Sequence, residues 1–295
     1  MKPAASFFNL RRRILRLILF LAYRPLKLRH SLARRVLLVA ACGALGLATA
    51  SAQDMMRHLD LTSAEMTTAE MTRADVQARM AAATNSQPAD FTGKKLSGLD
   101  LSGLDLSGAI FRAAKLNKVN LSDAKLDDAI LDQAWLLESD LSRASLKRAN
   151  MFAAQMQRAR LDRADLSGAR IVADLTGASL IGTLLSRANL AADMKNQSMG
   201  LIRAVLKSAN LEGVVLRDAD LSRVDLEFAS LKGADLTNAS LRGAALGGAT
   251  LVDVTMMGTD FLEADLTSTR LIRPIGLEFA RNFDKARNTD RILRE

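Results

Sequence analysis

The chain has 295 residues, of which 49% are hydrophobic and 4% aromatic, and its formal net charge at pH 7 is +9. Its single cysteine, Cys42, excludes an intramolecular disulfide, and its two histidines, His30 and His58, precede the periodic part of the sequence. The periodic part therefore lacks the residues for common zinc sites, histidine acid–base catalysis and Ser-His-Asp or Cys-His nucleophiles. The sequence predicts no enzyme, no catalytic or metal-ligating residue and no cofactor.

Residues 1–52 form a basic leader. The first 53 residues carry ten lysines and arginines and no acid, so the positive net charge of the chain comes from this segment. An apolar stretch, Val36–Ala48, follows a pair of arginines and precedes the small residues Ala50 and Ala52. This succession is typical of a secretory signal with cleavage between Ala52 and Gln53. We therefore expect export, to the periplasm or an equivalent compartment.

Three alternatives to a cleaved signal remain open. The apolar stretch could be retained as an inner-membrane anchor with its basic flank inside. Cys42, after Val39-Ala40-Ala41, could be a lipidation site. The acid-free leader with its Arg34-Arg35 pair could instead address the protein to a thylakoid lumen. Each alternative still places the rest of the chain across a membrane.

Residues 53–88 are predicted to be a linker and an N-terminal capping helix. The helix should begin after Thr72, since Asp75 stands three positions later as in a capping box, and should continue to Ala83. An alternative is a further partial coil at 59–76, where Met66, Met71 and Val76 keep the spacing of the repeats that follow.

An apolar residue returns at every fifth position between Phe91 and Leu271, usually with a small residue two places before it. A period of five fits neither the 3.6 of an α-helix nor the 2 of a flat strand. A repeat this short can bury its apolar positions only by stacking on copies of itself. The pattern therefore predicts a solenoid.

Individual units resemble the pentapeptide-repeat family. They include Ala-Asp-Leu-Ser-Gly at 164–168, Ala-Asn-Leu-Glu-Gly at 209–213 and Ala-Asp-Leu-Thr-Asn at 234–238. The resemblance implies an all-β fold, a right-handed quadrilateral parallel β-helix over 89–271 with four pentapeptides per coil. The central Leu and the Ala two before it would point inward. At about 20 residues per coil and about 4.8 Å between strands, roughly nine coils would give a rod about 43 Å long.

The five-residue register fails between Ile171 and Leu201. Leu175 arrives one residue early, and the original phase returns only at Leu201. We expect a bulged or looped side near 172–175 and 191–200. Because irregularities in solenoids often lie on a binding face, three basic residues are candidate partner contacts: Arg187, Lys195 and Arg203. A tolerated defect in the repeat is the alternative.

Residues 272–295 are predicted to be a C-terminal helical cap. Leu277, Phe283 and Ile292 fall on one side of a helix drawn over 277–293. Such a helix would cover the apolar cross-section that the last coil leaves open.

The charge of the repeat region limits the partners. Residues 91–271 hold 22 basic and 22 acidic residues, so this region lacks the negative charge density of a duplex. That argues against DNA mimicry, the mechanism of pentapeptide proteins that protect gyrase from fluoroquinolones, and equally against nucleic-acid binding. The remaining expectation is an exported, non-enzymatic scaffold that binds an unknown protein or envelope component. A membrane would be contacted only through an uncleaved leader, and the oligomeric state is left open.

Overall fold

The computed structural model describes residues 60–84, 86–194 and 202–294. The chain divides into two compact units, Met1–Ser51 and Ala52–Glu295, and only the second contains described residues. The predicted cleavage residues Ala50, Ala52 and Gln53 lie outside the described residues, as does Cys42. Within the described residues, no helix is both long enough and apolar enough to cross a bilayer.

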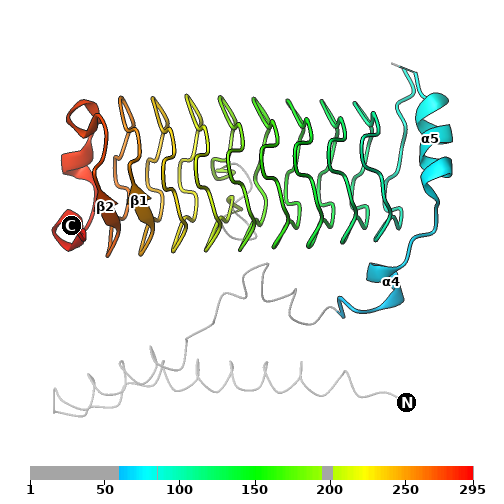
Figure 1. Cartoon of the computed structure of the whole chain (residues 1–295), viewed down its shortest axis with the longest axis horizontal. Helices are drawn as coiled ribbons and strands as arrows, with labels where there is room; N and C mark the ends of the chain where they lie inside the picture. Colours follow the sequence, from blue (N-terminus) through cyan, green and yellow to red (C-terminus); the bar gives the residue numbers. More distant parts are fainter. Residues whose placement is uncertain (1–59, 85, 195–201, 295) are drawn as a thin grey trace, which may run out of the picture. The chain divides into compact units, whose positions relative to one another are not determined.

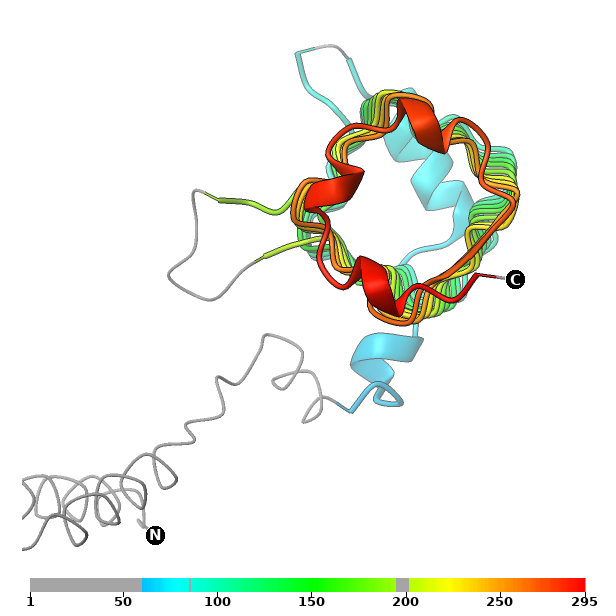
Figure 2. The same ribbon diagram turned by 90° about the vertical axis from the view of Figure 1, so that its left-hand side faces the viewer.

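The repeat region is a right-handed, four-sided parallel β-helix (Figures 1 and 2). Successive coils pair through four columns of parallel bridges, most of them twenty residues apart. We name the four sides by the residue that begins each column: Asp90 for the first side, Lys95 for the second, Asp100 for the third and Asp105 for the fourth. The first column runs from Asp90 through nine coils to Asp260, which agrees with the expected number.

The pentapeptide explains how each side folds. The central residue and the small residue two before it are buried, as at Leu121 and Val119, both 1% exposed or less. The backbone between and beside them pairs with both neighbouring coils. Asn120 N–H donates to Leu99 O of the preceding coil at 2.9 Å, and Leu121 N–H donates to Asp140 O of the following coil at 2.7 Å. The dry interior therefore needs no polar side chains.

The corner of each pentapeptide falls two residues after the central one. At Asp123 the backbone turns into the left-handed region with φ 59°. Many of these corners are glycines and several are Asp or Asn, the residues that adopt this conformation most readily, while arginines occupy others. The bridges are so short that only two strands form among the described residues, β1 (Thr250–Val252) and β2 (Arg270–Ile272), paired in parallel with Leu251 opposite Leu271.

Helix α5 (Arg73–Ala81) covers the N-terminal end, and a shorter helix, α4 (Ala64–Thr67), lies beside the first coils (Figure 2). Helix α5 begins where the sequence predicts, because Thr72 and Asp75 form the expected capping box. It ends at Ala81 rather than at Ala83. The alternative of an extra coil at 59–76 is wrong for the described part of that range. Residue Ala69 there pairs antiparallel with Leu96, not parallel with a coil.

The C-terminal end corrects the prediction of one helix over 277–293. Residues 273–294 form a tenth coil, in which Ile275, Arg281, Arg287 and Leu293 continue the bridge columns. These residues recur every six positions, and a short 3₁₀ turn lies between each pair: η2 (Leu277–Phe279), η3 (Phe283–Lys285) and η4 (Thr289–Arg291).

The helix fails because every turn starts at a residue with left-handed backbone. These residues are Gly276, Asn282 and Asn288, with φ of 73°, 54° and 58°. A continuous right-handed helix cannot pass through such positions. The cap is therefore helical only in its 3₁₀ turns, which still cover the core, as the edge-on contact of Phe283 with Phe261 shows at 5.3 Å between ring centroids.

Candidate interaction surface

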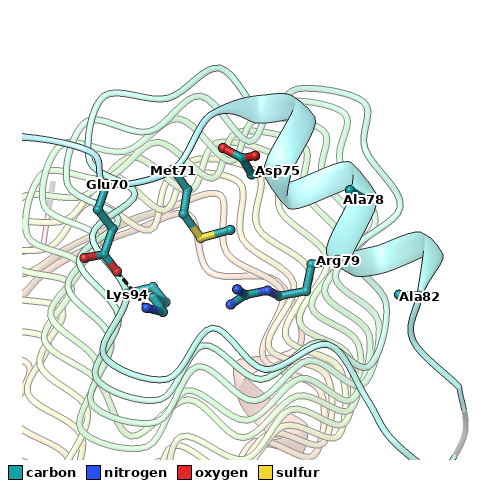
Figure 3. Close-up of a pocket in the computed structure, with 7 residues that line it drawn as sticks. All are labelled: Glu70, Met71, Asp75, Ala78, Arg79, Ala82 and Lys94. Atoms are coloured by element: carbon teal, nitrogen blue, oxygen red, sulfur yellow. Dashed lines mark ion pairs between the residues drawn. The ribbon is translucent and has the colours of Figure 1, made fainter.

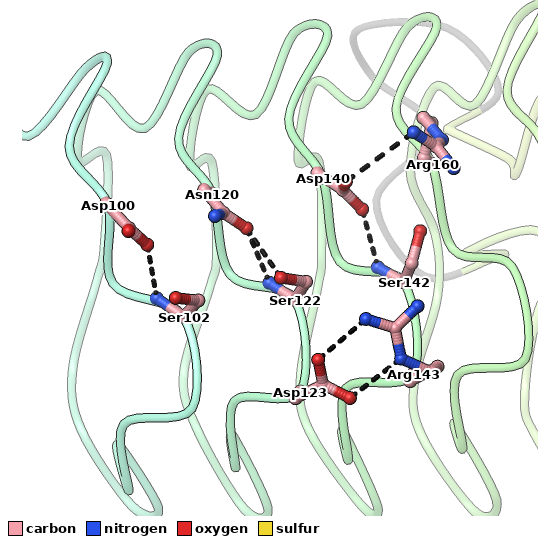
Figure 4. Close-up of polar contacts among 9 residues, drawn as sticks. All are labelled: Asp100, Ser102, Asn120, Ser122, Asp123, Asp140, Ser142, Arg143 and Arg160. Atoms are coloured by element: carbon pink, nitrogen blue, oxygen red, sulfur yellow. Dashed lines mark hydrogen bonds and ion pairs between the residues drawn. The ribbon is translucent and has the colours of Figure 1, made fainter.

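The outward row of acids closes turns. On the third side, Oδ1 of Asp100, Asn120 and Asp140 accepts the backbone N–H two residues later, at 2.9–3.1 Å (Figure 4). This local hydrogen bond is the reason that Asp and Asn favour tight turns. The outward row in these coils is therefore structural.

Corner residues of successive coils form exposed ion pairs along the rod. Arg143 donates two hydrogen bonds to Asp123, at 2.8 and 2.7 Å (Figure 4). Arg148 donates in the same way to Asp128 one corner further on. Hydrogen bonds from these guanidinium groups lower the pKa of both aspartates, so they are ionised at neutral pH. Within the described residues no group of His, Cys, Asp or Glu is arranged to hold a metal ion.

The predicted irregularity consists of one deletion and one insertion. Gln155 pairs with Asp174, nineteen residues later, so one residue is missing near 172–174. Asp174 then pairs with Val205, thirty-one residues later, which is eleven more than a regular coil. The two changes add ten residues, or two pentapeptides, and so the original phase returns. The insertion leaves the rod at the corner between the first and second sides.

The base of the insertion is held to the coils on both sides of it. Asp193 and Ile202 form an antiparallel bridge, with Asp193 N–H donating to Ile202 O at 2.8 Å. On one side, Asp193 pairs with Arg170 of the preceding coil at 3.7 Å. On the other, Arg203 pairs with Asp225 of the following coil at 2.9 Å. The side chains of Asp193 and Asp225 are 10% and 12% exposed. Solvent therefore screens these two ion pairs less than the exposed corner pairs described above.

An aromatic ring extends this contact onto the first side. The guanidinium carbon of Arg170 lies 4.4 Å from the ring centroid of Phe152. Arg170 is therefore held on one side by a cation–π contact with Phe152 and on the other by its ion pair with Asp193. We name Phe152, Arg170, Asp193, Arg203 and Asp225 the insertion base.

The three predicted contact residues do not form one cluster. Arg203 belongs to the insertion base. Lys195 lies outside the described residues. Arg187 is exposed at the end of the fourth side, and the whole first side, from Asn189, lies between it and Arg203.

Sequence inspection missed Arg170, Asp193 and Asp225, which hold the insertion in place. Arg170 stands one residue before the inward Ile171, and Asp225 one before Leu226, so both look like ordinary outward positions. The signal that could have found Asp193 is its place directly after Ala191 and Ala192, at the second break in the five-residue spacing. Their pairing depends on coils that only the structure places next to each other.

A concave feature lies at the N-terminal end, between α5 and the first coil (Figure 3). It is a shallow hollow of about 680 Å³. Its charged groups are already engaged: Lys94 pairs with Glu70 at 3.2 Å, and Arg79 donates to Asp90 O at 3.0 Å. Arg79 also lies 5.4 Å from the ring centroid of Phe91. These contacts close the end of the rod, and we assign the hollow to the cap.

Comparison with known proteins agrees with this architecture. The family model for pentapeptide repeats matches in eight copies, over residues 95–133, 136–168, 201–238 and 234–271. The chain is 30% identical to HetL, a pentapeptide repeat protein involved in heterocyst differentiation regulation from the cyanobacterium Nostoc sp. strain PCC 7120. The match has a TM-score of 0.53 and covers 72% of this chain and 95% of HetL. The chain therefore belongs to the pentapeptide-repeat family.

Two further solved structures are more distant. QnrB1, a plasmid-mediated fluoroquinolone resistance protein, is 15% identical, with a TM-score of 0.47 over 66% of this chain and 95% of QnrB1. A pentapeptide repeat protein from the Arabidopsis thaliana thylakoid lumen is 28% identical, with a TM-score of 0.25 over 35% of this chain and 68% of that protein. No curated protein matches the chain.

Proposed function

We propose that this protein is an exported, non-enzymatic member of the pentapeptide-repeat family that binds a protein or envelope component at the insertion base. The rod supplies a rigid support, and the segment between Asp193 and Arg203 supplies the contact. A rigid scaffold that presents an irregular segment is a common arrangement for recognition. The proposal gives the chain no catalytic residue and no cofactor.

The observation that carries the proposal is the anchoring of the insertion. Eleven additional residues interrupt an otherwise regular rod, yet their two ends are tied to different coils by two partly buried ion pairs, Arg170–Asp193 and Arg203–Asp225. Similar pairs join regular coils, as at Arg217–Asp235, but here they hold both ends of an added segment. The anchoring fixes those two ends, Asp193 and Arg203, on the rod.

The absence of catalysis is supported by the use of the carboxylates. In the part of the chain that the structure describes, many outward aspartates of the regular coils close turns, as Asp100 does, or pair with arginines, as Asp123 does. A convex surface of this kind does not provide the desolvated setting that raises a carboxylate pKa for acid–base work. The balanced charge of residues 91–271 also disfavours gyrase protection by imitation of a duplex.

Export is supported by the leader pattern alone. Intact-mass analysis of the protein from envelope fractions should find Gln53 as the first residue. A mature protein that begins at Met1 would contradict cleavage and favour a retained anchor. Incorporation of a lipid precursor at Cys42 would instead favour lipidation.

Binding at the insertion base is tested by affinity capture from the same fractions. The triple variant Arg187→Ala, Lys195→Ala, Arg203→Ala should lose the captured partner. A control triple variant in the exposed ion pairs, Arg143→Ala, Lys232→Ala, Arg273→Ala, should retain it. Both variants should keep the circular-dichroism spectrum of the rod.

Single variants then locate the contact. Arg203→Ala should weaken capture, because Arg203 lies in the insertion base, whereas Arg187→Ala should leave capture unchanged, because Arg187 lies one full side away. Capture that survives the triple change would show that the insertion is not the contact. Turnover of a substrate by the purified protein, or protection of gyrase from a quinolone, would contradict the proposed function as a whole.

A further inference from the structure

Phe228 stands at a corner where a large apolar side chain is unexpected. Its backbone has φ 59°, and its side chain is 60% exposed. A bulky residue in the left-handed region is an outlier, and an exposed ring gains little from burial. The ring lies across Gly248 of the next coil, where a Cβ would come within 2.7 Å of it. The position of the ring thus depends on a glycine one coil away.

The second side of the rod is hollowed beside this ring. Ala245, Gly247 and Gly248 leave the coil after Phe228 with no outward side chain beyond a methyl group, whereas the coils before and after it carry longer ones. The result is a hollow of about 370 Å³. Glu227 and Phe228 form one wall, and Asp265, Thr267 and Ser268 form the other. We name this feature the Phe228 hollow.

Both walls of the Phe228 hollow carry a carboxylate, and no basic residue lines it. Asp265 Oδ1 accepts from Thr267 Oγ1 at 2.6 Å and from Asn288 Nδ2 at 2.9 Å, hydrogen bonds that lower the pKa of Asp265, and its Oδ2 lies 4.0 Å from Arg287. Glu227 accepts from Lys207 of the preceding coil at 2.9 Å. Lys207 Nζ lies 5.4 Å from the ring centroid of Phe228, so this ring already attracts a cation from outside the hollow.

We propose that the Phe228 hollow binds an arginine side chain on an extended segment of a protein partner. A guanidinium group stacks on an aromatic ring and donates in two directions at once, which matches one ring with a carboxylate on each side. The hollow has room for one long side chain, not for a folded element. Lys207 and Arg287 already pair with these two carboxylates, but within the described residues Glu227 Oε1 and Asp265 Oδ2 accept no hydrogen bond, so each can accept one from a guanidinium group.

This inference goes beyond the proposed function, because the Phe228 hollow contains none of residues 193–203. The two sites can therefore fail independently. Deleting the insertion would leave the hollow intact, and filling the hollow would leave the insertion base intact.

The probe is the peptide acetyl-Gly-Gly-Arg-Gly-Gly-amide, titrated into full-length protein with isotope-labelled phenylalanine rings. We expect the ring signals of Phe228 to shift and to saturate. The same peptide with Glu in place of Arg should cause no shift. Phe228→Ala should weaken binding, followed by calorimetry, by about threefold to thirtyfold, the range of a partly desolvated cation–π contact.

Two matched variants keep this test independent of folding. Phe279 is also 60% exposed but lies in the terminal coil, so Phe279→Ala should bind the arginine peptide as the unchanged protein does. Gly247→Leu should fill the hollow and abolish binding. It is compatible with the fold, because Gly247 does not have left-handed backbone and its Cβ would find only ordinary contacts at 3.8 Å.

Three results would overturn the proposal. One is an arginine peptide that binds Phe228→Ala or Gly247→Leu with unchanged affinity. Another is a glutamate peptide that binds as tightly as the arginine peptide. The third is an arginine peptide that shifts the Phe279 signals as strongly as those of Phe228.

Discussion

The coils before residue 172 and the stretch from 172 to 228 share one interior but differ on their surfaces. In the earlier coils, outward residues such as Asp140 and Arg143 serve the rod itself: Asp140 closes a turn, and Arg143 pairs with Asp123. In the later stretch the rod loses one residue, gains eleven, and places Phe228 in solvent. The interior stays continuous throughout, with Leu166 and Leu206 both 1% exposed.

This difference separates two roles within a single repeat. The inward row is fixed by packing, because every coil must match its neighbours in a narrow, dry interior. The outward row is free to vary, as Ile110 and Trp135 at outward positions of regular coils show. We therefore look for the binding surface where the outside is irregular and the interior is not.

The largest expected effect comes from breaking the interior. Leu166→Asp should lower the free energy of unfolding by several kcal/mol, about 4, because it places an unpaired charge in a dry core. The matched outward change is Leu184→Asp, at a residue that is 41% exposed and whose carbonyl accepts from Leu166 N–H at 2.7 Å. It should cost about 1 kcal/mol or less. Thermal and urea melts followed by circular dichroism measure both, and equal losses would contradict the inward assignment of Leu166.

A smaller effect is expected at the insertion base. The Asp225 side chain is 12% exposed and does two things: it accepts Glu227 N–H at 3.1 Å, and it pairs with Arg203. Asp225→Ala should cost about 1–2 kcal/mol, because it removes a turn hydrogen bond and leaves a partly buried arginine without its partner. Asp123→Ala, in an exposed pair, should cost clearly less. If the two variants lost the same free energy of unfolding in urea melts, the insertion base would be no more firmly held than the exposed corner pairs.

The pH dependence of stability should follow the exposed arginine–aspartate pairs between successive coils. Arg143, Arg148 and Arg273 hydrogen-bond to Asp123, Asp128 and Asp253 and lower the pKa of each of these aspartates. Their contribution to stability is therefore fully present above the unfolded-state pKa of about 3.9 and is lost as the pH falls through the lower folded-state values.

The melting temperature should accordingly stay level from neutral pH down to about pH 5 and fall below about pH 4. Replacing the three aspartates by asparagine should flatten that fall. A melting temperature that rises on acidification would contradict the direction of these shifts.

The fold was predictable because one rule repeats across the chain. Leu121, Ala124 and Leu126 each state the same inward spacing, so the period of five specifies the solenoid many times over. The capping box of Thr72 and Asp75 was equally predictable, because it is local. The C-terminal coil was not, since Leu277, Phe283 and Ile292 fit a helical face. The decisive signal was the six-residue spacing of Gly276, Asn282 and Asn288, residues that tolerate left-handed backbone.

The candidate sites were predictable only in part. The loss of phase indicated where the rod is irregular, but not that Arg170 and Asp225 hold the insertion. Arg170 lies 23 residues before its partner in the insertion, and Asp225 lies 22 residues after its own. The Phe228 hollow likewise depends on Gly247 and Gly248, which reach Phe228 only through stacking of the coils. Short-range patterns indicate the inward row well, whereas contacts between coils on the outside need the structure.

The most direct test of the account is deletion of residues 193–203. This deletion joins Ala192 to Ala204 and restores an unbroken spacing of five from Leu190 to Leu206. If the insertion serves recognition and the interior does not need it, the free energy of unfolding should fall by no more than about 1–2 kcal/mol, the cost of the ion pairs that Arg170 and Asp225 lose, while affinity capture of the envelope partner is lost. A deletion protein that fails to fold, or that still captures the partner, would contradict the division between a structural interior and a recognising insertion.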